Sequence, residues 1–305
     1  MAAPSLALKI DVDTYRGTRE GVPPLVECLK RHNAGATLLF SLGPDHTGRA
    51  LKRVFRPGFL KKVSRTSVVE HYGIKTLLYG TLLPGPDIAR ECAELMRGVR
   101  DAGFEVGIHT YDHVRWQDGV AQADAAWARA EMDKAVEAFQ SVFGVAPHTH
   151  GAAGWQMNDA AYEHEQTLGM TYASDGRGTH PFVPVVNGRA LNVPQLPTTL
   201  PTLDELIGVG DLTPDNVHEH LLRLTANPPP QGHVYTLHAE LEGMKWMPVF
   251  DRLLSGWRAQ GYELVSTETL FKSLDVPALP HHAVAMGEIP GRSGTLALQG
   301  ARIAA

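Results

Sequence analysis

The chain has 305 residues, of which 43% are hydrophobic and 20% charged, and its formal net charge is -5. This composition is typical of a folded protein with a sizeable core, and the negative charge argues against a general nucleic-acid binder. The two cysteines form no CxxC pair, and no apolar run reaches the roughly 18 residues of a membrane span. The N-terminus lacks the basic and apolar regions of a signal peptide, so we expect a cytoplasmic location.

Short apolar runs alternate with segments of helical periodicity along the chain, which is the pattern of an α/β fold. Strands are predicted at 6–10, 36–40, 104–108, 145–148, 171–174, 233–237 and 262–266, and helices at 22–32, 87–99, 121–142, 158–168, 214–225 and 247–260. About seven such alternations favour a parallel β/α barrel, whose active site lies at the carboxyl ends of its strands. An open doubly wound sheet is the alternative, but it normally carries a glycine-rich loop after the first strand.

Asp11 and Asp13 stand at the end of the first predicted strand, where that glycine-rich loop would be. Because alternate residues of a strand share a face, the two carboxylates point the same way. A helix cap or a solvated turn is the plainer interpretation of such a pair.

Histidines follow two further strands. His109 and His113 come after the run at 104–108, and their spacing lets both imidazoles reach one divalent metal. His238 comes after the run at 233–237. Each histidine alone could be a hydrogen-bonded strand end, but a parallel barrel brings all three to the same rim as the aspartates.

One carboxylate and two histidines leave a coordination position open, as catalytic metal sites do. We therefore predict that Asp13, His109 and His113 bind one divalent ion, such as zinc, cobalt or manganese, which these ligand types do not distinguish. The ion would activate water and polarise a carbonyl, Asp11 would act as the base, and His238 would protonate the leaving group. The sequence thus predicts a hydrolase.

Residues 46–86 interrupt the αβ alternation with a basic segment that contains a single acidic residue, Glu70. Large apolar side chains lie between the basic ones at helical spacing, so the segment can dock on an anionic membrane surface. A helical hairpin packed on its own domain is the alternative, and the scarcity of aromatic stacking platforms argues against nucleic acid. The basic residues are Arg49, Lys52, Arg53, Arg56, Lys61, Lys62, Arg65 and Lys75.

Taken together, residues 6–273 resemble the polysaccharide deacetylase (NodB-homology) family of metal-dependent carbohydrate amidases. One branch is similar in longer motifs; its members are deformylases of 4-deoxy-4-formamido-L-arabinose linked to undecaprenyl phosphate. The matching motifs are IDVDTYRGTREGVP at 10–23, FSLGPD at 40–45, AAGW at 152–155, SDGRG at 174–178 and YTLHAE at 235–240.

The resemblance implies a distorted (β/α)7 barrel in residues 1–275, with 46–86 as a membrane-facing insert. Residues 276–305 form a tail rich in Pro, Gly and Ala, whose end is expected to be irregular. The resemblance repeats the roles deduced above for the base, the metal ligands and the acid. It also makes Asp175 the carboxylate that orients His238, and Arg177 a residue that positions a carboxylate.

Two departures from the family pattern bear on these roles. Many relatives carry adjacent aspartates where this chain has Asp11-Val12-Asp13. The Arg-x-Pro-Tyr-Gly type motif, which helps to build the oxyanion site, is replaced by residues 148–155, so the donor to the oxyanion is not assigned.

The implied function is removal of the formyl group as formate, giving an amino sugar that decorates lipid A and weakens polymyxin binding. The expected enzyme is a hydrolase of carbon-nitrogen bonds other than peptide bonds, peripheral on the cytoplasmic face of the bacterial inner membrane. A deacetylase of soluble N-acetyl glycans and a non-catalytic binder of the lipid-linked sugar are the alternatives.

Overall fold

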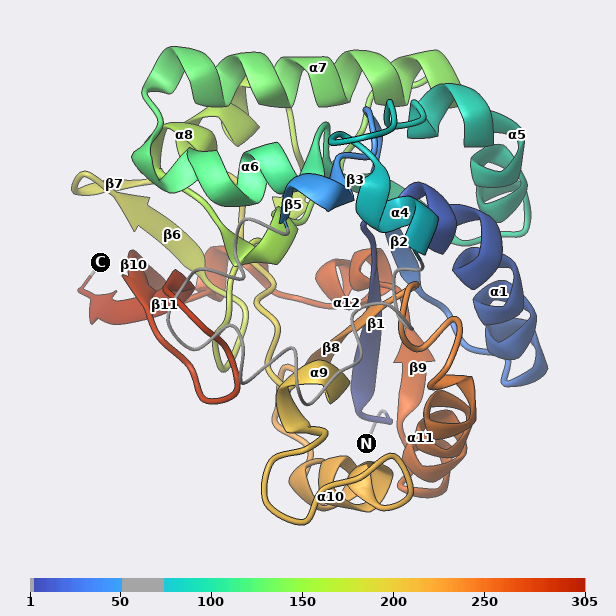
Figure 1. The fold of residues 1–305 in the computed structure, drawn as a ribbon. Helices are drawn as coiled ribbons and strands as arrows, with labels where there is room; N and C mark the ends of the chain where they lie inside the picture. Colours follow the sequence, from blue (N-terminus) through green and yellow to red (C-terminus); the bar gives the residue numbers. More distant parts are fainter. Residues whose placement is uncertain (1–2, 51–73, 305) are drawn as a thin grey trace.

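A parallel sheet curves through the centre of the molecule, with helices packed around it (Figure 1). The structure is a computed structural model and describes residues 3–50 and 74–304. Within these residues the sheet has seven strands, in the order β5-β4-β3-β2-β1-β8, and β9 pairs with the first half of β1. The strands are β1 (Ser5–Val12), β2 (Thr37–Ser41), β3 (Glu105–Thr110), β4 (Thr149–His150), β5 (Tyr172–Ala173), β8 (His233–His238) and β9 (Glu263–Val265).

Helices follow the strands and cover the outside of the sheet, with the long helix α7 along one side (Figure 1). Their starts follow the capping rules: Asp87, Asp124 and Asn158 each accept a hydrogen bond from the first turn of their helix. The longer helices are α1 (Val22–Arg31), α5 (Ile88–Asp101), α6 (His113–Gly119), α7 (Ala125–Phe143), α8 (Asp159–Thr167), α10 (Val217–Leu224) and α11 (Met247–Ala259); the short ones are α4 (Ile74–Leu78), α9 (Leu203–Leu206) and α12 (Thr267–Lys272).

The sheet is closed on one side by a segment without regular strand structure. Residues 194–199 run between β5 and β8: Leu196 N donates to Ala173 O at 2.8 Å, and Thr199 N donates to Val234 O at 3.0 Å. This segment takes the place of a further barrel strand. The predicted distorted barrel is confirmed, and its parallel strands aim their carboxyl ends at one rim.

The C-terminal tail forms a regular β-hairpin and not an irregular end. Strands β10 (His281–Gly287) and β11 (Leu296–Ile303) pair with each other, and β10 continues onto β6 (Val183–Val186), which pairs with β7 (Arg189–Ala190). This second sheet lies beside the barrel (Figure 1). The expectation of an irregular tail is therefore wrong over 281–303, because the tail finds strand partners in the Pro-rich stretch after β5.

Most predicted boundaries differ from the structure by one to four residues, and the shifts at β3 and β4 bear on the site. Strand β3 runs to Thr110, so His109 lies inside the strand, because the ladder to β2 continues to the pair Ser41 and Thr110. Strand β4 begins at Thr149, after the run predicted at 145–148. Both shifts are of the size expected when a boundary is inferred from apolar periodicity alone.

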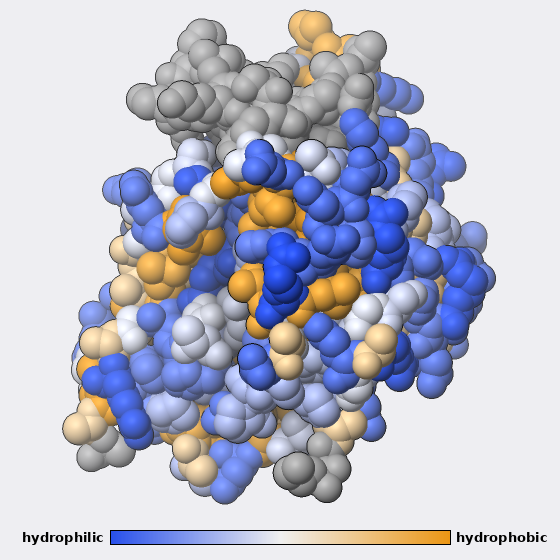
Figure 2. Space-filling view, turned by 90° about the horizontal axis from the view of Figure 1, so that it is seen from below, coloured by the Kyte–Doolittle hydropathy of each residue, from blue (hydrophilic) through white to orange (hydrophobic). Residues whose placement is uncertain are grey.

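The face of the molecule that Figure 2 shows is mainly hydrophilic in its described residues. Figure 2 shows one face, on which apolar side chains gather in smaller groups among hydrophilic ones. None of the helices in the described ranges is long and apolar enough to cross a membrane. Among the large apolar side chains exposed in these ranges, Leu82 is exposed most, at 80%.

Candidate metal and active site

Strands β1 and β8 deliver two of the predicted catalytic residues side by side. Asp11 and His238 are register partners in the parallel ladder, so their side chains point to the same face of the sheet. Asp11 is 3% exposed, and neither its Oδ1 nor Nδ1 of His238 finds a hydrogen-bond partner in the part of the chain that the structure describes. Buried polar atoms of this kind are costly, which points to a role with a ligand.

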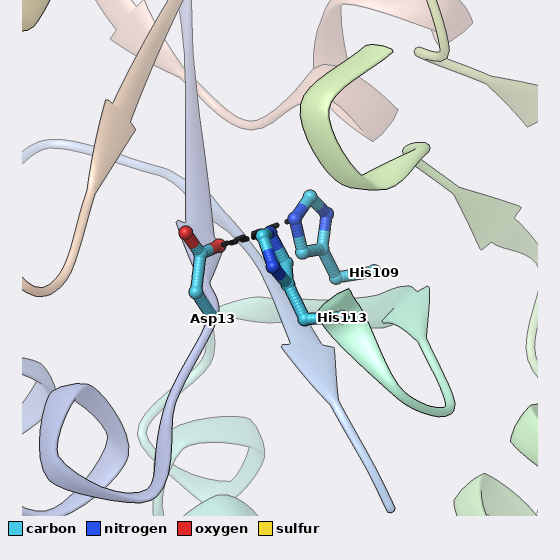
Figure 3. A group of neighbouring side chains, drawn as sticks. All are labelled: Asp13, His109 and His113. Carbon is cyan, nitrogen blue, oxygen red and sulfur yellow. Dashed lines mark ion pairs between the residues drawn. The ribbon is translucent and has the colours of Figure 1, made fainter. Parts of the chain in front are cut away.

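The three predicted metal ligands converge at the carboxyl ends of β1 and β3, with His109 still inside β3 (Figure 3). Oδ1 of Asp13 lies 3.2 Å from Nε2 of His109 and 3.4 Å from Nε2 of His113. His113 is the first residue of α6, where Asp112 caps the helix by accepting from Arg115 N at 3.0 Å. The sequence thus positions His113 through a strand, a tight turn and a helix cap.

The orientation of the His109 ring suits a metal ligand. Its Nδ1 lies 2.6 Å from the carbonyl oxygen of Gly151, which can only accept, so Nδ1 is the donor of this hydrogen bond. The other ring nitrogen, Nε2, is thereby turned toward Oδ1 of Asp13. A backbone carbonyl that holds one ring nitrogen in this way is the usual support for a histidine that binds metal through the other.

The spacing of the ligand atoms also fits a metal. A tetrahedral ion with bonds of about 2.1 Å keeps its ligand atoms roughly 3.4 Å apart, close to the observed 3.2 and 3.4 Å. Burial raises the pKa of Asp13, but the imidazoles of His113 and His109 outweigh it and bring that pKa well below its usual value. Asp13 is therefore a carboxylate, the form that binds metal.

A buried lysine stands beside the predicted base. Lys9 is fully buried in β1, two residues before Asp11, and its Nζ lies 3.5 Å from Oδ2 of Asp11. The ammonium also donates to Ser174 O at 2.9 Å. A Cβ on Gly151 would lie 2.9 Å from Cε of Lys9, so this position leaves no room for a side chain. Lys9 thus holds one oxygen of Asp11 and leaves the other available.

Glu240 braces the loop that carries Asp13. One of its carboxylate oxygens accepts from the backbone of Asp13 at 3.1 Å and from Thr14 N at 2.9 Å and Oγ1 at 2.8 Å. Its side chain packs directly over Gly17, where a Cβ would lie 1.8 Å from Oε1. Burial and the charge of Asp13 raise the pKa of Glu240 well above its ordinary value.

The family resemblance implied that Asp175 orients His238, but in the structure Asp175 pairs with His150. Its Oδ1 lies 2.6 Å from Nδ1 of His150 and accepts from Ala152 N at 2.9 Å, while Oδ2 accepts from Gln195 at 2.8 Å. Both carboxylate oxygens of Asp175 therefore accept hydrogen bonds from β4 and its neighbouring segments. The geometry therefore corrects the prediction that Asp175 orients His238.

A third titratable residue, Glu165, completes this buried cluster. Its Oε1 lies 3.2 Å from Nδ1 of His150. Burial lowers the pKa of His150, but Asp175 and Glu165 outweigh it and raise that pKa to about 10. Burial and the charge of Asp175 raise the pKa of Glu165 well above its usual value, whereas His150 lowers that of Asp175 against the effect of burial. The cluster therefore holds a cation, an anion and a neutral acid.

Arg177 pairs with the carboxylate of Glu205, and its role in catalysis stays a prediction. Nη1 of Arg177 donates to Oε1 of Glu205 at 2.6 Å, and Nη2 donates to Leu200 O at 3.0 Å. The guanidinium lies 5.0 Å from the ring centre of Trp155. Trp155 belongs to the AAGW motif and adopts an unusual positive φ of 53°.

Sequence reasoning missed several residues of this region, and the signals differ. Lys9 interrupts an otherwise apolar run that was predicted to be buried, and a lone charge in such a run is a detectable signal. His150 and Glu165 lie apart in the chain and are brought together by β4 and α8, which no local pattern shows.

Comparison with known proteins agrees with this geometry. Residues 2–173 match the family model described as Polysaccharide deacetylase. The chain is 38% identical over 299 residues to a protein of Shewanella sediminis named probable 4-deoxy-4-formamido-L-arabinose-phosphoundecaprenol deformylase ArnD, covering 98% of this chain and 95% of that one. A protein of Wigglesworthia glossinidia brevipalpis with the same name is 29% identical, covering 93% and 98%.

A solved structure shows the same fold. The crystal structure of a Mycobacterium smegmatis protein assigned as a polysaccharide deacetylase has a TM-score of 0.63 and 17% identity, and it covers 94% of this chain and 96% of its own. The family match, the identity to the Shewanella protein and the shared architecture lead to one conclusion. The chain belongs to the polysaccharide deacetylase family.

Proposed function

We propose that the protein removes the formyl group from 4-deoxy-4-formamido-L-arabinose linked to undecaprenyl phosphate, releasing formate. The observation that carries this proposal is the meeting of Asp11, His238 and the Asp13, His109 and His113 triad at one rim of the barrel. The relatives named as deformylases of this substrate support the choice of substrate. The product amino sugar would serve lipid A modification and resistance to polymyxin.

The reaction class follows from the family to which the chain belongs. The protein is a hydrolase of carbon-nitrogen bonds other than peptide bonds, because it belongs to the deacetylase family and its relatives are named deformylases. A non-catalytic sugar binder would need neither the unpaired Oδ1 of Asp11 nor an imidazole facing it.

The proposed roles follow from the donor set. A divalent cation held by Asp13, His109 and His113 would act as a Lewis acid and make an attacking water more acidic. Asp11, with one oxygen held by Lys9, takes the proton from that water with the other oxygen. His238, on the neighbouring strand, donates a proton to the nitrogen of the leaving amine. Zinc, cobalt and manganese all suit these ligands.

The proposed location is the cytoplasmic face of the inner membrane, reached through residues 46–86. Of this insert, 51–73 lie outside the described residues. Its described ends support docking near the site: Nδ1 of His46 lies 2.6 Å from Oδ2 of Asp112, the residue that caps the helix of His113. The neighbouring Leu82 is 80% exposed, as expected of a side chain that enters a lipid surface.

The direct test is formate release from the formamido-arabinose undecaprenyl phosphate by metal-loaded protein. We expect release, and we expect none from an N-acetyl glucosamine oligomer. Turnover of the glycan with no formate from the lipid would contradict the substrate and favour the soluble-glycan deacetylase.

The location is tested separately by sedimentation with vesicles. We expect the protein to bind vesicles that contain anionic lipid and to leave neutral ones, and Leu82→Asp to weaken this binding without changing the melting temperature. Equal binding by the parent and Leu82→Asp, with Val145→Asp as a control on an exposed residue outside the insert, would remove Leu82 from the docking surface.

A further inference from the structure

The C-terminal hairpin is attached to the rim of the active site. Arg177 N donates to Ala297 O at 2.9 Å, and Gln299 N donates to Arg177 O at 2.8 Å, so β11 runs along the loop that follows β5. Gln156, just after the AAGW motif, donates to Thr295 O at 2.6 Å. The hairpin therefore forms part of the wall beside the site.

The turn of this hairpin places Arg292 over Trp155. The guanidinium carbon lies 4.2 Å from the ring centre, closer than that of Arg177 at 5.0 Å. The side chain of Arg292 is 12% exposed. The turn is fixed by Gly291, which has a φ of 84° and where a Cβ would lie 2.6 Å from Glu205 O. Only glycine allows the hairpin to approach this closely.

Glu205 holds both guanidinium groups in place. Its Oε1 accepts from Nη1 of Arg177 at 2.6 Å and from Nε of Arg292 at 2.9 Å, while its Oε2 accepts from Thr202 N in the capping box of α9. Nε of Arg177 is buried and has no hydrogen-bond partner in the ranges that the structure describes. Nη2 of Arg292 also lies 3.5 Å from Oδ2 of Asp204. The two guanidinium groups together still carry more N–H donors than these carboxylate contacts use.

Trp155 connects Arg292 with the predicted base. Nζ of Lys9 lies 5.7 Å from the centre of the Trp155 ring and 3.5 Å from Oδ2 of Asp11. Arg292 and the pair of Lys9 and Asp11 therefore lie around one indole ring, which places the guanidinium beside the rim of the site.

We propose that Arg292, supported by Arg177, binds the phosphate of a glycosyl phosphate whose amide is hydrolysed at the metal site. This inference rests on the proposed function for its substrate, in which the formamide nitrogen is on C4 and the phosphate on C1 of one sugar ring. The formamide and the phosphate are attached at opposite ends of the ring. An anion site must therefore lie about the length of one sugar ring away from the metal. Guanidinium groups match phosphate through paired hydrogen bonds.

The first test compares substrates with and without phosphate in the metal-loaded full chain. Arg292→Gln should raise KM for the lipid-linked substrate by about 10- to 100-fold with little change in kcat, as expected for a lost charged hydrogen bond. It should leave kcat/KM unchanged for the neutral methyl 4-deoxy-4-formamido-L-arabinopyranoside. Arg292→Lys keeps the positive charge but not the paired N–H donors of the guanidinium. Its KM should therefore lie between those of the parent and of Arg292→Gln.

Arg302→Gln is the matched control, because Arg302 is exposed near the other end of β11; it should behave as the parent does. Equal losses on both substrates in Arg292→Gln would mean that Arg292 only supports the fold of the wall, and would overturn the proposal.

The second test is independent of turnover and measures binding of L-arabinopyranosyl 1-phosphate against free L-arabinose by calorimetry. We expect the phosphate to strengthen binding in the parent but not in Arg292→Gln. If this dependence is found while no substrate releases formate, the deformylase proposal fails and the anion site stands. If formate is released but phosphate binding is the same in parent and Arg292→Gln, the anion site is refuted.

Discussion

Two clusters of histidine and carboxylate lie near each other in this barrel, and they differ in how their polar atoms are satisfied. In the triad of Asp13, His109 and His113, Oδ1 of Asp13 has no hydrogen-bond partner among the described residues. In the cluster of His150, Glu165 and Asp175, both oxygens of Asp175 and Nδ1 of His150 are hydrogen-bonded within the protein. Residue type alone would predict metal at both.

The difference favours the first cluster as the metal site that we propose, because its unsatisfied atom is available to a ligand, whereas the atoms of the second cluster are satisfied within the protein. His150, Glu165 and Asp175 are each at most 3% exposed, and their charges balance internally. Asp175 also accepts from Ala152 N, next to the Gly151 carbonyl that fixes the tautomer of His109. The second cluster therefore supports the first through the backbone of residues 150–152.

The largest expected effect is loss of the metal. Asp13→Ala removes the only carboxylate of the triad, so activity should fall about 1,000-fold or more and the purified protein should no longer retain a stoichiometric ion. Elemental analysis after gel filtration measures the ion. Asp175→Ala is the matched removal in the other cluster and should leave the ion bound; loss of metal in Asp175→Ala alone would reverse the comparison.

Asp11→Asn should separate catalysis from metal binding. Activity should fall by about 100- to 10,000-fold because the amide cannot take a proton, while the ion remains bound. His238→Gln should give a loss of similar size by removing the acid. Steady-state formate release and metal content are measured on the same samples, and full activity in Asp11→Asn would assign the base elsewhere.

Asp175→Asn should act mainly on stability. It leaves the buried His150 cation without its closest anion, so the free energy of unfolding should fall by about 3–5 kcal/mol. Urea denaturation of the metal-free protein measures this change. If the variant lost activity at unchanged stability, Asp175 would return to the catalytic role that the sequence suggested.

The same cluster predicts a pH dependence of stability. His150 has a pKa of about 10 in the folded protein against 6.5 when unfolded, so its contribution is complete below pH 6.5 and is lost as the pH rises toward 10. The raised pKa of Glu165 acts in the same direction. The melting temperature of metal-free protein should therefore fall between pH 7 and 9, and the fall should be shallower in His150→Gln; an identical slope would contradict this account.

Glu165→Gln should have the smallest effect, below about 1 kcal/mol. The raised pKa keeps Glu165 neutral at pH 7, and an amide can replace the hydrogen bonds of the neutral acid. Comparison of its urea midpoint with that of Asp175→Asn tests which carboxyl group carries the charge. A loss as large as that of Asp175→Asn would show that Glu165 is ionised.

Much of the fold could be predicted from the sequence, because apolar runs of strand length alternate with amphipathic helical segments. The rim position of Asp11, Asp13 and His238 followed from the parallel topology alone, since each residue lies at or just past a strand end. The tail could not be predicted: β10 and β11 depend on pairing with β6, about a hundred residues earlier, and turn-rich composition conceals such long-range ladders.

The sequence by itself determined the family and the barrel and predicted that Asp13, His109 and His113 meet, because these depend on local periodicity and on motifs that are contiguous in the chain. Only the tertiary structure decided the partner of Asp175, the burial of Lys9 beside Asp11, and the arrival of Arg292 over Trp155. Each of these contacts depends on segments that are distant in the chain or on the direction in which a side chain points, and no local pattern fixes either. The physical reason is that packing and charge pairing act through space, whereas helix and strand signals act along the chain.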